Sequence, residues 1–474
     1  MPSYTYPLPD LKDYDISRKT GFLPEELPLS HLPAYYEPWE LIVNNLPALL
    51  LTKRVRSMVL NLPYLTCSHL ATDREYRRAY SVLGYIAHAY IWGVNEITDK
   101  LPKQIADPWL EVSEKLGLPP VATYAGLVLW NWQQIIPGEK ATTDEEFLNN
   151  LKVIDTFTGS LDECWFYLVS VYFEYKGAPC ISTGLDAIKH ARENNPEKVK
   201  ECLQALAEQI DYLGSALMKM QEMCDPHVFY FKLRPYLAGW KNMQDLGLNG
   251  VYYGDHPTPR VYSGGSNAQS SLIQTLDLLL NISHHSTGEA SSSAKENPFM
   301  NSMKKYMPGK HAKFLDHLAK VNVIRDYVIS HSKSDPELLL AYNAAVAMMK
   351  TFRDKHIQIV TRYIVLQAQK SRSMGSETTS TVRAGLAKAR PEKKTEELRG
   401  TGGTALLPFL KQCRDETGNT AAGSWGKRLL RDGPLSSRRP LQRESTDIPL
   451  QTKKHLNLPS ELDDDASSLT RGHW

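Results

Sequence analysis

Helical periodicity runs through most of the chain and constrains its fold more than any other feature. Apolar residues recur at spacings of three and four up to about residue 370, as in Trp39, Ile42 and Leu46. This spacing places apolar side chains along one face of a helix. The alternating patterns typical of strands form no convincing set, and no repeat of fixed period occurs. The sequence therefore predicts a mainly α protein.

Individual helices are expected where this periodicity is unbroken. Asp73 and Glu75 precede one such run and predict a capped helix start with acid in its first turn. Pro119 and Pro120 interrupt the pattern before it resumes at Tyr124. Further helices are predicted over residues 161–176, 196–223, 267–283, 298–319 and 335–369.

Length and changes in composition define the expected domains. A chain of 474 residues is longer than one core usually supports, so two domains are expected. After Lys370 the apolar pattern gives way to Ser, Thr, Gly and charge, and residues 371–404 are expected to form a mobile loop. Residues 404–413 are apolar enough to dock again. Residues 417–474 are rich in Ser, Pro and charge and are predicted to be a disordered tail.

Charge, hydropathy and cysteine usage argue against several classes of protein. A formal net charge of +2 gives no global field to attract nucleic acid or a membrane surface. No apolar run approaches the length of about 20 residues that a membrane span needs, and residues 1–15 lack the apolar stretch of a secretory signal. The 6 cysteines are scattered without a CxxC pair, which indicates reduced thiols rather than disulfides or a zinc site. We expect a cytoplasmic monomer that binds neither nucleic acid nor membranes.

The chain also lacks the P-loop, the GxGxxG turn, HExxH and the GxSxG elbow.

A histidine on an apolar helix face is the first candidate site of the chain. His356 shares one stripe with Met349, Phe352, Ile359 and Tyr363. A neutral imidazole in this position is able to ligate a haem iron, with Arg353 one turn away and within reach of a propionate. A core histidine that bonds a backbone carbonyl is the commoner meaning of this pattern.

Arg234 is the second candidate, because it lies among aromatic residues in the stretch 226–240. A guanidinium is costly to bury unless it meets an anion, and its planar fork suits a carboxylate. Pro235 disfavours regular α geometry at Arg234, so a bend is expected there. The alternative is a salt bridge to a carboxylate of the protein.

Two glycine-containing stretches, 263–271 and 400–404, are predicted to approach a ligand closely or to hinge a lid, although plain flexible loops also fit them.

Taken together, these stretches resemble segments of the indoleamine 2,3-dioxygenase family. Residues 355–363 are similar to the family's proximal-histidine helix, and the similarity covers roughly residues 30–415. The other matching segments, each in its expected place along the chain, are residues 77–80, 89–93, 229–240, 263–271, 306–308 and 400–404.

The resemblance implies a small N-terminal helical domain, residues 1–155, over a larger helical domain, residues 156–416, with haem b between them. His356 then resembles the proximal ligand of the iron, and Arg353 with Asp277 the polar group near one propionate. Arg234 resembles the residue that binds the substrate carboxylate. The other implied substrate-binding residues are Tyr124, Phe166, Ser170 and Phe229 in the pocket wall, Gly265 and Ser266 in the lining loop, and Thr404 in the mobile lid.

The resemblance also implies an activity, which is insertion of both atoms of O2 into the indole C2–C3 bond of L-tryptophan. The product is N-formylkynurenine, in the kynurenine pathway of tryptophan catabolism that leads to NAD biosynthesis. The expected partners are L-tryptophan, O2 and an electron donor that keeps the haem iron ferrous. Indole is electron-rich, so the pocket needs shape, dryness and a carboxylate anchor more than a strong acid or base. No catalytic residue beyond the iron is implied.

Two alternatives stay open beside the dioxygenase. One is a weakly active paralogue that prefers another indoleamine. The other is a haem-binding sensor or signalling protein whose tail recruits partners. A carboxylate anchor at Arg234 favours catalysis over sensing, since a gas sensor has no need of it. A haem-free scaffold is disfavoured by the joint presence of His356 and Arg353.

Overall fold

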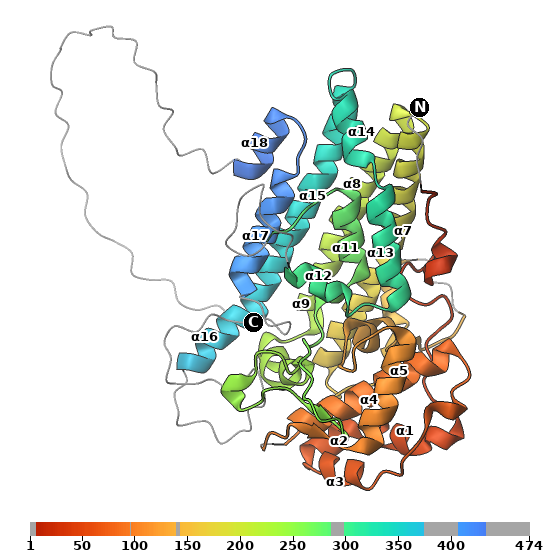
Figure 1. Cartoon of the computed structure of the whole chain (residues 1–474). Helices are drawn as coiled ribbons and strands as arrows, with labels where there is room; N and C mark the ends of the chain where they lie inside the picture. Colours follow the sequence, from red (N-terminus) through yellow and green to blue (C-terminus); the bar gives the residue numbers. More distant parts are fainter. Residues whose placement is uncertain (1–5, 95, 139–142, 286–297, 374–405, 433–474) are drawn as a thin grey trace, which may run out of the picture. The chain divides into compact units, whose positions relative to one another are not determined.

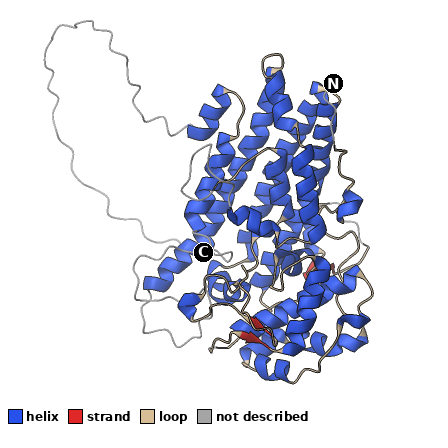
Figure 2. Ribbon diagram, in the orientation of Figure 1, coloured by secondary structure: helices blue, strands red, loops and turns tan. Residues whose placement is uncertain are grey.

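The computed structural model describes residues 6–94, 96–138, 143–285, 298–373 and 406–432. Helices dominate this part of the chain, which confirms the predicted mainly α class (Figure 2). The helices of the N-terminal part are α1 (Glu37–Asn44), α2 (Leu46–Leu51), α3 (Val55–Leu60), α4 (Asp73–Trp92), α5 (Lys103–Leu116) and α6 (Asp144–Asn149). They are followed by α7 (Leu161–Arg192), α8 (Pro196–Met218), α9 (Met220–Met223), α10 (Pro226–Val228), α11 (Ser271–Leu279) and α12 (Pro298–Lys304). The last are α13 (Gly309–Val321), α14 (Ile324–His331), α15 (Pro336–Val360), α16 (Leu366–Ser373), α17 (Leu406–Asn419) and α18 (Ser424–Asp432).

Two pairs of very short strands accompany the helices. β1 (Lys100–Leu101) pairs in parallel with β4 (Tyr252–Tyr253), and β2 (Trp132–Gln134) pairs antiparallel with β3 (Leu151–Val153). No sequence pattern indicated these strands, because two or three residues are too few to show alternation.

Helix α4 is the central helix of the N-terminal part. Its N-cap is Thr72, whose hydroxyl accepts from the backbone of Glu75 while the Glu75 carboxylate accepts from the Thr72 N–H. This capping box satisfies two donors that the first turn would leave unpaired. The cap therefore precedes the predicted one, Asp73, by one residue. Every residue from Arg78 to Trp92 is buried, as is typical of a helix surrounded by other elements.

Three long helices, α7, α8 and α15, pack together and form the body of the C-terminal part (Figure 1). α7 begins after the N-cap Ser160, with Asp162 and Glu163 in its first turn and basic residues in its last. This order of charge matches the helix dipole at both ends. Gly177 lets α11 approach α7, since a Cβ there would lie 2.0 Å from the Leu272 side chain.

Two hydrophobic clusters fill the interior. The first cluster draws on α1–α5, the first half of α7 and residues 216–253, and the second on the rest of α7 with α8, α11 and α13–α15. The division falls within α7, where Tyr172 belongs to the first cluster and Phe173 to the second. The N-terminal residues Leu11, Ile16 and Phe22 also pack into the second cluster. Because the clusters do not divide at one point of the sequence, the boundary between residues 155 and 156 stays a prediction.

The C-terminal part corrects two expectations. The first three residues of the loop expected over 371–404 belong to α16, which continues to Ser373, and residues 374–405 lie outside the described part. Part of the tail expected to be disordered over 417–474 is ordered, since α17 runs to Asn419 and α18 follows it. Thr417 is fully buried, and Ala421 and Ala422 join the second cluster. Small side chains bury little surface each, so the composition did not reveal this packing. Residues 433–474 lie outside the described part.

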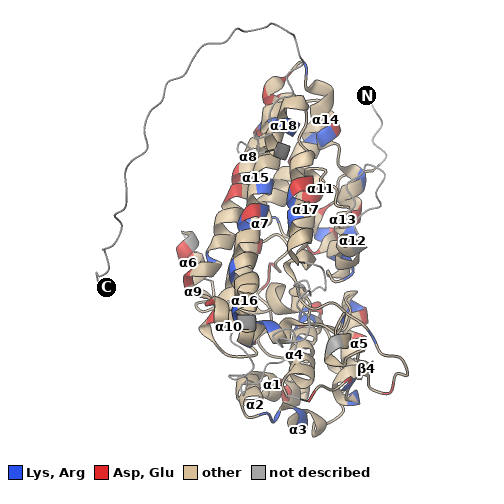
Figure 3. Cartoon of the chain, turned by 90° about the vertical axis from the view of Figure 1, so that its left-hand side faces the viewer, with Lys and Arg blue, Asp and Glu red and all other residues tan. Residues whose placement is uncertain are grey.

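Acidic and basic residues are interspersed along the helices in view (Figure 3). Among the described residues, no helix is both long and apolar enough to cross a membrane. All 6 cysteines are free thiols, as the sequence predicts.

Candidate active site

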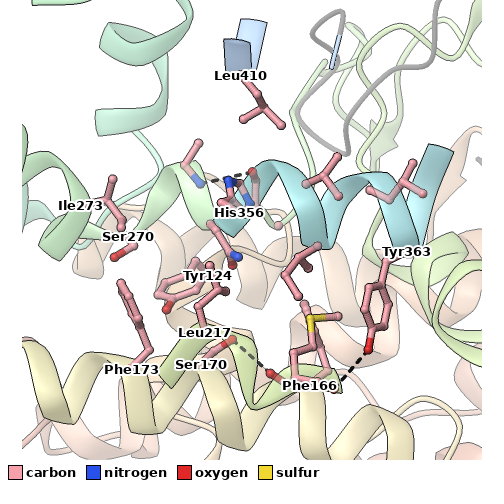
Figure 4. Close-up of a pocket in the computed structure, with 18 of the residues that line it drawn as sticks. Tyr124, Phe166, Ser170, Phe173, Leu217, Ser270, Ile273, His356, Tyr363 and Leu410 are labelled. Atoms are coloured by element: carbon pink, nitrogen blue, oxygen red, sulfur yellow. Dashed lines mark hydrogen bonds between the residues drawn. The ribbon is translucent and has the colours of Figure 1, made fainter. Parts of the chain in front are cut away.

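A cavity of about 230 Å³ lies between α7 and α15 and is lined mainly by apolar side chains. In Figure 4, Phe166, Ser170 and Phe173 lie on α7 along one side, and His356 and Tyr363 lie opposite them on the α15 side. The predicted site residues found in the lining are Tyr124, Phe166, Ser170, Phe229, Arg234, Gly265, Ser266, Arg353 and His356. Thr404 lies outside the described residues, and Asp277 stands behind Arg353 rather than in the lining.

His356 lies near the C-terminal end of α15, one turn before the helix widens into a π turn over Thr361–Val365. The predicted stripe is confirmed, since Phe352, Ile359 and Tyr363 line the same cavity. The His356 ring is half-buried and makes no hydrogen bond within the described part of the chain. Burial, aided by the positive charge of Arg353, lowers its pKa to about 4. The imidazole is therefore neutral near pH 7, with a ring nitrogen lone pair for a metal.

Arg353 connects this wall to a charged cluster. Its guanidinium donates to Asp277 on α11 at 2.5 Å, and Asp277 accepts from His284 at 3.2 Å. The other ring nitrogen of His284 lies 2.8 Å from Glu416 on α17. Burial alone would lower the pKa of His284, but Asp277 and Glu416 raise it well above its usual value. The cluster thus pairs two cations with two carboxylates and fixes Arg353.

The same cluster has the ligand types of a metal site. Ligand atoms of His284, Cys413 and Glu416 lie within 4.8 Å of one another. A metal needs a deprotonated ring nitrogen, whereas His284 is protonated and directs both N–H groups at carboxylates. The group is balanced in charge without an ion.

Aromatic rings form the wall opposite His356. The ring centres of Phe166 and Phe229 are 5.0 Å apart, and those of Phe229 and Tyr363 are 5.7 Å apart. Ser170 donates its hydroxyl hydrogen to the Phe166 carbonyl at 3.0 Å, so its oxygen remains an acceptor beside the cavity. The Tyr124 hydroxyl instead donates to Glu174 behind the wall. These contacts give the cavity a fixed and largely apolar surface.

Arg234 is the buried cation of this wall. A π turn over Phe229–Leu233 ends there and a 3-10 turn over Arg234–Leu237 begins, but Arg234 itself keeps α-region backbone angles (φ −51°, ψ −35°), so the departure from α geometry expected at this residue is absent. The residue is 2% exposed, and its guanidinium carbon lies 5.1 Å from the centre of the Tyr230 ring. Burial lowers the pKa of the guanidinium. A carboxylate bound in the cavity would offset the free-energy cost of burying this charged group.

The glycine-containing loop packs on the segment that follows Arg234. The backbone N–H groups of Trp240 and Lys241 both donate to the Tyr262 carbonyl, at 2.8 and 2.9 Å. A Cβ on Gly264 would lie 2.1 Å from the Leu237 carbonyl oxygen, so only glycine fits there. The Tyr306 hydroxyl accepts from the Ser263 N–H at 2.9 Å. The loop that brings Gly265 and Ser266 to the cavity is therefore held at its N-terminal edge.

Sequence reasoning missed several residues of the lining. It expected residues 404–413 to dock, but no pattern indicated that this segment would reach the site. The missed residues are Phe173, Leu217, Met220, Ile273, Leu406, Phe409, Leu410 and Cys413. They are ordinary apolar helix residues, which a one-dimensional pattern cannot distinguish from core.

Comparison with known proteins finds relatives over most of the chain. Residues 10–420 match the sequence model of the family Indoleamine 2,3-dioxygenase. The chain is 46% identical over 433 residues to the indoleamine 2,3-dioxygenase of Saccharomyces cerevisiae, a match that covers 88% of this chain and 94% of the relative. It is 36% identical over 421 residues to indoleamine 2,3-dioxygenase 1 of Rattus norvegicus, covering 88% and 96%. It is 34% identical over 411 residues to the 6-hydroxytryptophan 2,3-dioxygenase of Fusarium equiseti, covering 86% and 96%.

Proposed function

The chain belongs to the indoleamine 2,3-dioxygenase family, and from this premise we propose that its substrate is L-tryptophan. It is an enzyme of the oxidoreductase class. The proposed reaction breaks the indole C2–C3 bond and leaves one oxygen atom of O2 on each of those carbons, giving N-formylkynurenine. Every atom of both substrates is retained in the product. The observation that carries the proposal is one cavity with a neutral histidine on one wall and a buried arginine among aromatic rings on another.

The residues of the His356 wall fit a haem. The ring is neutral, lacks a hydrogen-bond partner in the described chain and faces an apolar cavity. His356 would hold the iron, and Arg353, fixed by Asp277, would lie near a propionate. Haem, when bound, supplies the redox-active iron at which dioxygen becomes reactive.

The other residues bind the substrate, orient it and exclude water. Arg234 would hold the carboxylate of tryptophan through two hydrogen bonds. The rings of Phe166 and Phe229 would contact the flat indole and keep water out. The described lining contains no carboxylate and no second histidine. Oxidation of the electron-rich indole ring suits such a site, because it needs no strong general acid or base.

The carboxylate anchor can be tested with two substrates on one enzyme. Tryptamine lacks the carboxylate of tryptophan, and Arg234→Lys replaces the planar fork by a point charge. Losing the bidentate contact should cost about 2–5 kcal/mol, or roughly 30- to several-thousand-fold in kcat/KM. Arg234→Lys should lower kcat/KM for tryptophan while that for tryptamine, already low, hardly changes.

Three outcomes would change the proposal. Equal turnover of tryptamine and tryptophan by the wild type would contradict the anchor. Haem binding without turnover of any indole substrate would favour the sensor alternative. Faster turnover of 6-hydroxytryptophan than of tryptophan would keep the reaction but change the substrate.

A further inference from the structure

Glu174 is a buried acid behind the wall of the cavity, on α7 one turn beyond Ser170. It is 1% exposed and does not line the cavity itself. Its Oε1 accepts two hydrogen bonds, from the Tyr124 hydroxyl at 3.0 Å and the Ser270 hydroxyl at 2.6 Å. Its Oε2 has no hydrogen-bond partner within the described residues. Burial raises its pKa to about 7, against the hydrogen bonds from Ser270 and Tyr124 that lower it.

The two donors come from separate parts of the wall. Tyr124 belongs to the first hydrophobic cluster, and Ser270 is the N-cap of α11, which packs in the second. Both line the cavity, whereas Glu174 lies on the helix between them. One carboxylate oxygen therefore joins three segments that are 50 and 96 residues apart in sequence.

A side-chain amide continues the same connection. Gln269 accepts from the Tyr124 backbone N–H at 2.9 Å and donates to the Gly264 carbonyl at 2.8 Å. The loop from Gly264 to Ser270 is thus attached to Tyr124 twice, once directly through Gln269 and once through Glu174. A rigid shell of this kind holds a binding surface in the geometry that its ligand needs.

Burying a carboxyl group costs free energy of folding, so stability alone does not explain why an acid occupies position 174. A half-satisfied carboxyl in an apolar interior is worse for stability than a hydrocarbon side chain of similar size. What an apolar residue cannot do is fix the direction of two hydroxyl groups. Glu174 draws both hydroxyl hydrogens away from the cavity, so the Tyr124 ring and the end of the loop face inward in one arrangement.

We propose that Glu174 is a positioning residue, which holds the Tyr124 ring and the loop 264–270 at the spacing that the indole ring requires. The inference rests on the proposed function, since it names indole as the ligand of this wall. Glu174 touches neither the substrate nor the reacting atoms. Its effect is on the affinity for tryptophan and is transmitted by Tyr124 and Ser270.

The experiment measures the Kd of L-tryptophan for the haem-loaded protein by calorimetry without dioxygen, and then kcat and KM in air. Glu174→Leu removes both hydrogen bonds and should raise Kd and KM about tenfold, with kcat changed less than about threefold. Glu174→Gln keeps a carbonyl oxygen that accepts from both hydroxyls, and should restore Kd to within about threefold of the wild type. Haem content should be the same in all.

Glu163→Gln is the matched control. Glu163 lies on the same helix and is equally buried, but its carboxylate accepts from Phe157 and Thr158, which do not line the cavity. It should lower the unfolding midpoint without changing Kd. If Glu174→Leu fails to fold, Ser270→Ala removes one of the two bonds and should still raise Kd by about threefold.

The results separate the two proposals. A wild type that binds tryptophan but forms no product would contradict the proposed function, while the Kd series would still decide the role of Glu174. Unchanged Kd in both Glu174→Leu and Ser270→Ala, or a Glu163→Gln variant that raises Kd as much as Glu174→Leu, would overturn the positioning role. So would a wild type that does not bind tryptophan.

Discussion

Two histidines on two long helices have the same lowered pKa and opposite surroundings. His88 on α4 is fully buried, its Nδ1 lies 2.8 Å from the Tyr236 carbonyl and its Nε2 accepts from the Ala122 N–H at 2.9 Å. His356 on α15 faces the cavity and makes no hydrogen bond within the described chain. Burial is the main cause that lowers the pKa of each ring to about 4.

The difference shows how a structural histidine is distinguished from a ligand. Both nitrogens of His88 are used by the backbone, so the ring connects the helix to two segments and has no lone pair left for a metal. The neutral ring of His356 lines a cavity of mainly apolar groups, and within the described chain no hydrogen bond uses its lone pair. A lowered pKa shows only that both rings are neutral. The hydrogen-bond partners of each ring distinguish a structural histidine from a candidate metal ligand.

Replacing His356 should have the largest effect. His356→Ala removes the proposed iron ligand, so stable haem binding should be lost while the helical fold remains. The measurement is the Soret absorbance per protein, beside a circular dichroism spectrum. A variant with a full Soret band and unchanged ligation would break the comparison, because His356 would then be another core histidine.

Replacing His88 should change stability and leave haem content per folded molecule unaltered. His88→Ala orphans the Ala122 N–H and the Tyr236 carbonyl and leaves a cavity, so the free energy of unfolding should fall by about 3–5 kcal/mol. Denaturant titration at pH 7 measures it. Loss of haem with unchanged stability would mean that the roles of the two histidines were assigned the wrong way round.

The pH dependence of the stability of His88→Ala tests whether the pKa of His88 is lowered in the folded chain. Because the pKa of His88 is about 4 in the folded chain and about 6.5 when unfolded, the unfolded state binds the extra proton between these values. The stability that His88 contributes is therefore complete above about pH 6.5 and is lost as the pH falls to about 4. The difference between wild type and His88→Ala should shrink by about 3 kcal/mol over that range. A constant difference would show that the folded ring titrates normally.

The smallest effect is expected outside both histidine regions. Truncation after Asp432 keeps α17 and α18 and should leave turnover within about threefold, a change of roughly 0.7 kcal/mol in barrier. Truncation after Thr417 should be harmful, because it removes Ala421 and Ala422 from the second cluster. Steady-state kinetics and thermal unfolding of both variants provide the measurement. An inactive protein ending at Asp432 would show that the tail contributes to the reaction.

Part of the site was predictable from local sequence. The stripe that carries His356 and the glycines of the 263–271 loop follow from spacing and residue type, whereas Tyr124, Phe166 and Ser170 were implied only by the family resemblance. Glu174 was not predictable in the same way. In sequence it stands between Phe173 and Tyr175 on a helix, where an acid usually faces solvent, and its two partners are 50 and 96 residues away. His88 gave no local sign of its role either.

The sequence by itself determined the helical class, the apolar stripe around His356 and the residue types available to the site, because these depend on periodicity and residue type over one or two turns. The tertiary structure decided which groups are satisfied by the protein and which face the cavity. It alone placed α17 against the site, paired Arg353 with Asp277 and joined Tyr124 to Ser270 through Glu174. The physical reason is that a hydrogen bond or a desolvation cost depends on neighbours in space, and those neighbours come from distant parts of the chain.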